Sequence, residues 1–252
     1  MAVSQRAQEA RKQLFPNETS SLQTTDPEFV EIFDNFAFDE VLAYSQLSVK
    51  LRLKVILGAL IGVQSLNEFK QMMVSALKVG VTPVEIKEIV YQAIPYLGQG
   101  KVMDFLYGSN DVLKEQGISL PLEGQATSNQ ATRYEKGLEI VKEVTGDVVD
   151  QMLETMPANQ VHLAKFIVTG FGDYFSRNGL TIRERELLIF TFLATMGGAE
   201  RQLEGHIINN IRVGNAPQEL IETLTVLLPF IGYPRTLTAL NCLNAVLKEE
   251  EI

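Results

Sequence analysis

The sequence Val79-Gly80-Val81-Thr82-Pro83-Val84-Glu85-Ile86 decides the fold, because a diverged copy returns 134 residues later as Val213-Gly214-Asn215-Ala216-Pro217-Gln218-Glu219-Leu220. The glycine of each copy suits the left-handed conformation that ends a helix. The proline of each copy suits the first turn of the next helix, where a backbone N–H would lack a partner. Each copy therefore predicts a tight hairpin of two helices.

Two more pairs of segments repeat with nearly the same spacing. Ile94-Pro95-Tyr96-Leu97-Gly98 matches Leu228-Pro229-Phe230-Ile231-Gly232, again 134 residues later. Leu47–Arg52 matches Leu180–Arg185 at a spacing of 133, so one residue is inserted between the two sites, in the turn before His206. Three separated matches in one register indicate that the chain contains two copies of one module.

Helix punctuation is frequent, whereas period-2 alternation and hairpin turns are scarce, so the sequence predicts an all-α fold. Thr82 with Glu85, and Thr181 with Glu184, fit the capping-box pattern, while Ala216 makes a weaker cap. The expected helices span roughly 3–15, 28–44, 49–62, 65–79, 83–97, 100–116, 131–144, 147–155, 158–176, 182–197, 200–213, 217–231 and 234–249.

The chain divides into four predicted segments. Residues 1–27 form an N-terminal helix or arm, and residues 28–116 form the first helical module. Residues 117–130 are rich in Gly, Ser, Asn and Pro, which predicts a linker. Residues 131–252 form the second module.

Composition excludes several classes of function. Apolar residues make up 46% of the 252 and charged residues 21%, which is typical of a globular protein. The net charge is −9 without a Lys/Arg cluster, so we expect no nucleic-acid partner. The longest apolar stretches, including Leu187–Gly198, are shorter than the roughly 20 residues that cross a bilayer, so we expect no membrane span. Met1–Arg11 lacks the apolar region of a secretory signal, which predicts a cytoplasmic protein.

Candidate chemistry concentrates in the second module. Arg183-Glu184-Arg185-Glu186-Leu187-Leu188 begins one predicted helix, which ends at Gly197-Gly198, and Ala199–His206 begins the next. A histidine, two carboxylates and an arginine could meet across these helices. Histidine exchanges protons near neutral pH, and a neighbouring carboxylate fixes its tautomer and favours its charged form.

A structural interpretation of the same residues stays open. His206 could be a hydrogen-bonded helix residue, and Arg183–Glu186 a solvated, ion-paired first turn. In the first module, Met72 replaces His206, Leu66 replaces Glu200 and Leu53 replaces Glu186. This asymmetry is expected if the first module kept only its packing role, but also from divergence at surface positions.

The remaining reactive residues predict no further site. His162 is expected on a helix surface or as a hydrogen-bonded core residue. Two histidines and one cysteine give no metal-ligand spacing, and no nucleotide-binding or nucleophile motif is present, so we expect no metal and no cofactor. Cys242 is predicted to be an inert core thiol.

Four stretches of the second module resemble the carboxymuconolactone decarboxylase family: Phe171–Leu188, Gln202–His206, Val213–Asn215 and Gly232–Arg235. The resemblance is close over about residues 158–248 and fainter over about 28–116, which looks like a degenerate first copy. It implies two tandem modules of the alkylhydroperoxidase D-like helical fold.

One branch of that superfamily, the alkylhydroperoxidase D-like proteins, reduces disulfides with a Cys-x-x-Cys pair followed four residues later by histidine. Relative to His206, those cysteine positions hold Ala199 and Gln202, and the first module has Ser65 and Glu68 there. Cys242 is the only cysteine, so disulfide reduction by this route is excluded.

The resemblance to the decarboxylase branch implies a cofactor-independent lyase for a small carboxylated or lactone-like molecule. Arg185 would hold the substrate carboxylate, His206 would protonate the ring carbon as carbon dioxide leaves, and Glu186 would orient His206. Glu200 and Tyr233 are weaker substrate-binding candidates. Two alternatives stay open: an antioxidant, peroxidase-like member without the cysteine pair, and a non-enzymatic oligomeric or binding protein.

The same resemblance has a consequence for assembly. Family members form rings, commonly of six single-module chains. A chain with two modules could build the same ring as a homotrimer.

Overall fold

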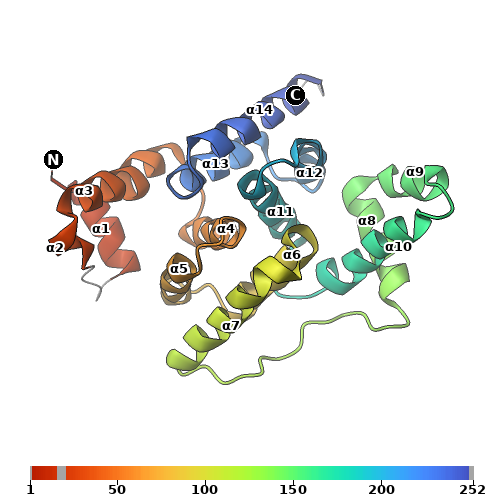
Figure 1. Ribbon diagram of the computed structural model, residues 1–252, viewed down its shortest axis with the longest axis horizontal. Coiled ribbons are helices and arrows are strands. Elements are labelled where there is room, and N and C mark those ends of the chain that lie inside the picture. Colours follow the sequence, from red (N-terminus) through yellow and green to blue (C-terminus); the bar gives the residue numbers. More distant parts are fainter. Residues whose placement is uncertain (1, 16–20, 250–252) are drawn as a thin grey trace.

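The computed structural model describes residues 2–15 and 21–249, and every regular element within them is helical (Figure 1). The predicted all-α fold is therefore confirmed. Parts of the segments predicted at 1–27 and 131–252 lie outside the described residues. Within the described part of the chain, no helix combines the length and apolar character needed to span a membrane.

Apart from one 3₁₀ turn in the first half, the elements follow the same order in both halves of the chain. The first half contains α1 (Gln5–Leu14), α2 (Leu22–Thr25), α3 (Pro27–Asn35), the π-turn η1 (Phe36–Glu40), the 3₁₀ turn η2 (Val41–Tyr44), α4 (Val49–Gly62), α5 (Leu66–Lys78), α6 (Pro83–Leu97) and α7 (Gln99–Glu115). The second half contains α8 (Arg133–Thr145), α9 (Val148–Thr155), α10 (Val161–Gly170), the π-turn η3 (Phe171–Phe175), α11 (Ile182–Met196), α12 (Glu200–Arg212), α13 (Pro217–Ile231) and α14 (Tyr233–Glu249).

The two modules share one core. Helices α4 and α11, which occupy the same place in their modules, pack side by side near the centre of the molecule (Figure 1). Helix α6 packs on α11, and α13 packs on α4, so each module covers the central helix of the other. Both central helices are almost wholly buried, and their apolar side chains belong to one continuous cluster.

The helix ends form as the repeat predicts. Both capping boxes are present, at the starts of α6 and α11. Gly80 and Gly214 have φ angles of +88° and +93°. At the start of α13, Ala216 has no side-chain acceptor, and only the Glu219 carboxylate accepts a hydrogen bond from the Ala216 N–H, at 2.7 Å.

One cation joins the two capping boxes. The buried ammonium of Lys54 on α4 binds Glu85 of the α6 box and, at 2.6 Å, Glu184 of the α11 box. Burial alone would lower the pKa of Lys54, but the hydrogen bonds to Glu184 and Glu85 raise it above its ordinary value. This ammonium, shared by two carboxylates, therefore stabilises the junction of the two modules, where the apolar core also lies.

The structure divides two helices that the sequence predicts as continuous. The predicted helices 28–44 and 158–176 each contain an α-helix followed by a π-turn, η1 in the first module and η3 in the second. Apolar spacing does not separate a π-turn from a regular turn, so the sequence could not locate these breaks. The one-turn helix α2 also carries no periodicity.

The repeat extends to the N-terminal helix. Helix α1 packs against η1 and α3, just as α8 packs against η3 and α10 (Figure 1). The two groups lie at opposite ends of the molecule. Between α7 and α8 the chain runs without helix from residue 116 to 132, across the predicted linker.

The α4–α11 contact predicts a position-specific cost for added volume. A Cβ at Gly62 would lie 1.9 Å from Oγ1 and 2.7 Å from Cβ of Thr195. We expect Gly62→Ala to lower the free energy of unfolding by about 1–3 kcal/mol, because the helices must separate to admit the methyl group. Urea unfolding of both chains measures this difference.

Gly100→Ala on α7 is the matched control, because nothing lies within 4 Å of its added Cβ. It should leave stability unchanged or raise it by up to about 1 kcal/mol. Equal stability of the two variants would show that α4 and α11 leave room for a methyl group between Gly62 and Thr195.

Candidate active site

An apolar cavity of about 760 Å³ lies between the two modules. Helix α6 of the first module forms one wall, and α8, α9, α10, η3 and α12 of the second form the rest. Its apolar walls are formed mainly by Val141, Val148, Val149, Met152, Phe166, Ile167, Phe171, Phe175 and Ile208. Its polar side chains are Tyr96, Thr145, Gln202, His206, Asn209 and Arg212.

The carboxylate of Glu186 and the imidazole of His206 meet at this cavity. Nδ1 of His206 lies 2.8 Å from Oε2 of Glu186. The Glu186 side chain is fully buried, whereas that of His206 remains 16% exposed. An ionised carboxylate only accepts hydrogen bonds, so this geometry assigns a proton to Nδ1 and leaves Nε2 as the ring nitrogen available to the cavity.

Two buried asparagines fix the helices that carry this pair. Nδ2 of Asn210 donates to the backbone carbonyls of Glu186, at 3.0 Å, and of His206, at 2.7 Å. Nδ2 of Asn215 in turn donates to Oδ1 of Asn210 at 2.8 Å. Such a network holds α11 and α12 at one spacing, as a catalytic pair requires. Oε1 of Glu186 is buried and has no hydrogen-bond partner among the described residues.

The first module contributes Tyr96 from α6. Its ring meets the His206 ring edge to face, with centroids 5.4 Å apart. Burial, and then the charge of Glu186, raise the pKa of the Tyr96 phenol well above its ordinary value. The phenol therefore stays protonated. The sequence repeat could have indicated this residue. It pairs Tyr96 with Phe230, and of the two only Tyr96 carries a polar group.

Helix α12 presents a polar stripe of which sequence reasoning assigned only His206. Gln202, His206, Asn209 and Arg212 recur at helical spacing and all line the cavity. The Arg212 guanidinium stands at the α8–α9 turn, where Nη1 donates to the carbonyl of Val144 at 3.0 Å. Arg212 is therefore the cation that the cavity offers to a bound anion.

The structure does not bring Arg185 to the cavity, which argues against its predicted role as the carboxylate clamp. Its guanidinium is fully buried on the opposite side of α11, where Nη2 lies 3.1 Å from Oε2 of Glu88. Nη1 donates to Oε1 of Gln92 at 2.9 Å, and Nη2 also donates to the carbonyl of Arg177. Burial lowers the pKa of Arg185, although the Glu88 carboxylate opposes this. No substrate carboxylate can reach it.

Glu200 and Tyr233 also lie outside the His206 cavity. Glu200 lines a separate cavity with Gly197 and Arg235. Tyr233 is 62% exposed and stacks on Phe36. Both predicted substrate-binding roles therefore lack a structural basis.

Three other sequence predictions can be compared with the structure. His162 is exposed on α10, as one interpretation expects. Cys242 is buried in α14, and burial raises the pKa of its thiol, so the predicted core thiol is confirmed. The alternative of a solvated Arg183–Glu186 turn is wrong for Arg185 and Glu186, which are both buried.

The first module has lost every polar partner of the pair. The positions that match Glu186, His206, Asn210 and Asn215 hold Leu53, Met72, Ala76 and Val81, and all four are buried. A cavity of about 640 Å³ lies at the matching place, but it presents Phe33, Phe230, Glu68 and Gln71. At these four positions the asymmetry thus lies in the core, whereas Glu200, which Leu66 replaces, is exposed. Within the described residues, no group of three or more His, Cys, Asp or Glu side chains could hold a metal ion.

Comparison with known proteins agrees with this two-module organisation. The model of the carboxymuconolactone decarboxylase family matches residues 27–106 and 162–245, one stretch in each half. The chain belongs to the carboxymuconolactone decarboxylase family. The two matched stretches agree with the two tandem modules that the sequence predicts. In the first module, Leu53 and Met72 replace the polar pair.

One solved structure supports the same fold. It is a protein from Burkholderia xenovorans LB400 with the provisional description "gamma-carboxymuconolactone decarboxylase subunit". The two chains share 22% sequence identity, the TM-score is 0.57, and the match covers 97% of each chain. No curated protein matches this family member in sequence.

The burial of Arg185 predicts a loss of stability rather than a specific loss of substrate binding. We expect Arg185→Met to lower the free energy of unfolding by about 3–5 kcal/mol, because it leaves the buried Glu88 with one guanidinium instead of two. Urea unfolding followed by circular dichroism measures the change.

Arg183→Met is the matched control on the same helix turn. Arg183 is 52% exposed and pairs with Glu219, so its loss should cost at most about 1 kcal/mol. An Arg185→Met chain as stable as Arg183→Met would show that Arg185 does not neutralise a buried carboxylate.

Proposed function

We propose that this family member is a cofactor-independent, decarboxylase-like lyase acting on a small carboxylated or lactone-like molecule in the His206 cavity. One observation carries the proposal. The fully buried Glu186 carboxylate holds Nδ1 of His206 at 2.8 Å, at a cavity of about 760 Å³ whose other walls are mostly apolar. A tautomer-fixed imidazole in such a cavity is suited to proton transfer to carbon.

Substrate binding follows from the arrangement of the walls. The apolar body of the substrate lies against Phe171, Phe175 and Met152, and its carboxylate faces Arg212. Arg212 thus holds the substrate carboxylate, the role that the family resemblance implied for Arg185. Its guanidinium is held by the Val144 carbonyl through Nη1, which leaves Nη2 and Nε to meet an anion.

The reaction needs one proton. The bond between the ring carbon and the carboxylate breaks, carbon dioxide leaves, and the electron pair moves into the conjugated lactone. The imidazolium of His206 then delivers the proton on Nε2 to the ring carbon, and solvent restores it. The Glu186 carboxylate compensates the charge of the imidazolium, and Tyr96, which contacts the His206 ring and also lines the cavity, supplies a protonated phenol as a hydrogen-bond donor for a lactone oxygen.

Neither alternative function gains support from the site. The antioxidant alternative, a member without the cysteine pair, gains no thiol at the cavity, because Cys242 is a buried residue of α14 that does not line it. The non-enzymatic binding alternative leaves unexplained why a buried carboxylate and two buried asparagines hold the histidine. It predicts ligand binding without turnover.

Turnover tests the roles of the pair. A panel of unsaturated lactone carboxylates is screened for release of carbon dioxide, and kcat and KM are measured on the best substrate. We expect His206→Ala to lower kcat by about 10²–10⁴-fold, because it removes the proton donor. Arg212→Gln should mainly raise KM. In deuterium oxide, the wild-type product should carry one deuterium at the protonated carbon.

His162→Ala is the matched control, because His162 is the only other histidine and is exposed on α10. It should retain wild-type kcat and KM. Equal kcat in His206→Ala and His162→Ala would exclude His206 as the proton donor, and binding of the panel without turnover would favour the non-enzymatic alternative.

We also propose that the chain assembles as a ring-shaped homotrimer through the two ends of the molecule. Exposed apolar side chains occur on α3, at Phe29 and Ile32, and at the matching place on α10, at Leu163 and Phe166. Ile32 and Phe166 are exposed by 63% and 66%. Large exposed apolar side chains at two corresponding places are typical of self-association surfaces.

Light scattering tests the assembly. The expected mass is three times the chain mass of 28.1 kDa. Ile32→Glu with Phe166→Glu should shift it toward the mass of one chain, because each charge would be buried unpaired in the interface. Leu237→Glu, at an exposed position of α14, is the control and should leave the mass unchanged. A wild-type mass of 28.1 kDa would exclude the trimer.

A further inference from the structure

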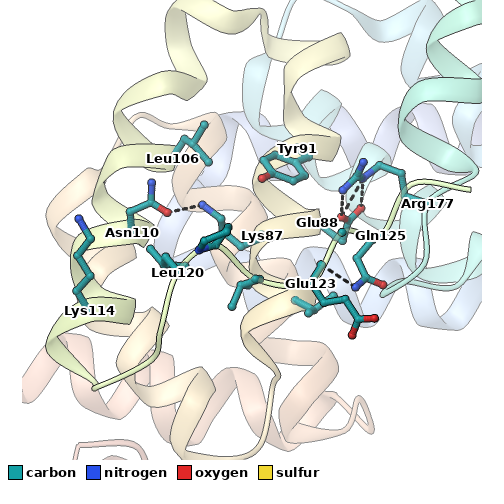
Figure 2. A pocket seen from close by; sticks show the side chains of 14 residues that line it. Lys87, Glu88, Tyr91, Leu106, Asn110, Lys114, Leu120, Glu123, Gln125 and Arg177 are labelled. Carbon is teal, nitrogen blue, oxygen red and sulfur yellow. Dashed lines mark hydrogen bonds and ion pairs between the residues drawn. The ribbon is translucent and has the colours of Figure 1, made fainter. Parts of the chain in front are cut away.

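Another cavity, of about 470 Å³, lies beneath the linker that joins the two modules. Figure 2 shows that α6, α7 and the linker surround it, with Lys87 and Asn110 on one side and Glu88 and Arg177 on the other. None of its lining residues also lines the His206 cavity. The proposed reaction leaves this linker cavity unused.

The feature that needs explanation is the ammonium group of Lys87. This residue is only 8% exposed, and its Nζ donates to the neutral Oδ1 of Asn110 at 2.6 Å. It also lies 5.8 Å from the ring centroid of Tyr91. Among the described residues, no carboxylate forms an ion pair with it. Burial lowers the pKa of Lys87, because a cation without a counter-charge is costly to remove from water.

The neighbouring carboxylates do not supply that counter-charge. Glu88 is buried, and two guanidinium groups already bind it, Arg177 at 2.9 Å and Arg185 at 3.1 Å. Glu123 lines the cavity from the linker, but its carboxylate is directed away from Lys87 in Figure 2. Lys114 adds another positive charge to the lining. The cavity is therefore cationic on the side of Lys87.

Part of the cavity lining is apolar, and the linker above it is held in place. Val84, Leu106 and Leu120 line it from α6, α7 and the linker. The linker is tied to the segment before α11, because the backbone N–H of Asn178 donates to the carbonyl of Gln125 at 3.0 Å. The hydroxyl of Thr127 also donates to the carbonyl of Ser176, at 2.6 Å. The cavity thus has a fixed cover.

We propose that the linker cavity binds a small organic carboxylate, whose anionic group pairs with Nζ of Lys87 and whose apolar body lies against Val84, Leu106 and Leu120. Its volume of about 470 Å³ falls within the range of ligand cavities. The carboxylate supplies the counter-charge that the protein withholds from Lys87. This binding is independent of His206 and of the proposed lyase activity.

Calorimetry with two matched probes tests the charge requirement. Cyclohexanecarboxylate and its neutral amide have nearly the same shape, and only the acid should bind with saturation. Lys87→Met should weaken binding of the acid by about tenfold or more. Lys101→Met, at an exposed position of α7, is the matched control and should leave it within about twofold. Arg212→Gln separates binding in the linker cavity from binding in the His206 cavity.

NMR on the wild-type chain locates the site even if Lys87→Met does not fold. Because Oδ1 of Asn110 accepts from Lys87, the side-chain amide signal of Asn110 should shift with the acid and not with the amide. The proposal fails if the acid does not saturate, if Asn110 does not respond, or if the amide binds equally well. It also fails if a folded Lys87→Met chain keeps wild-type affinity, or if only Arg212→Gln weakens binding.

Discussion

The close approach of α4 and α11 is the constraint on which the rest of the structure depends. At Gly62 the first central helix has no side chain, and Thr195 of the second fills the space. This contact turns two copies of one module into a single core, since α6 can then cover α11 and α13 can cover α4. The His206 cavity exists only because of that exchange, as its Tyr96 comes from the first module and its histidine from the second.

The two copies of the module differ in the residues that they bury at matching positions. In the second module, Glu186, His206, Asn210 and Asn215 form a buried hydrogen-bonded set between two helices. In the first module, the matching residues are small or large apolar side chains that fill the same volume. Buried polar groups are stable only when their partners are present, so such a set is expected to be kept or lost as a whole. The apolar copy supplies packing, and the polar copy keeps the hydrogen-bonded Glu186–His206 pair.

Charge is distributed between two sides of α11. Glu186 faces α12 and the histidine, whereas Arg185 faces α6 and shares the Glu88 carboxylate with Arg177. The same α6 turn carries Lys87, whose ammonium has only a neutral partner. The junction of the modules therefore contains the hydrogen-bonded Glu186–His206 pair on one side of α11 and the cationic linker cavity beside α6.

The sequence by itself determined the helical class, the internal repeat and most helix ends, because glycine, proline and capping residues act within a few positions of the chain. It also placed Glu186 and His206 on two helices that a short turn brings together. Only the tertiary structure decided that Arg185 leaves this site. Successive helix residues point about 100° apart, and packing against α6 chose which of the two neighbours faces the cavity. The same holds for Tyr96 and Arg212, because a cavity between modules is formed by helices that local sequence signals cannot orient relative to one another.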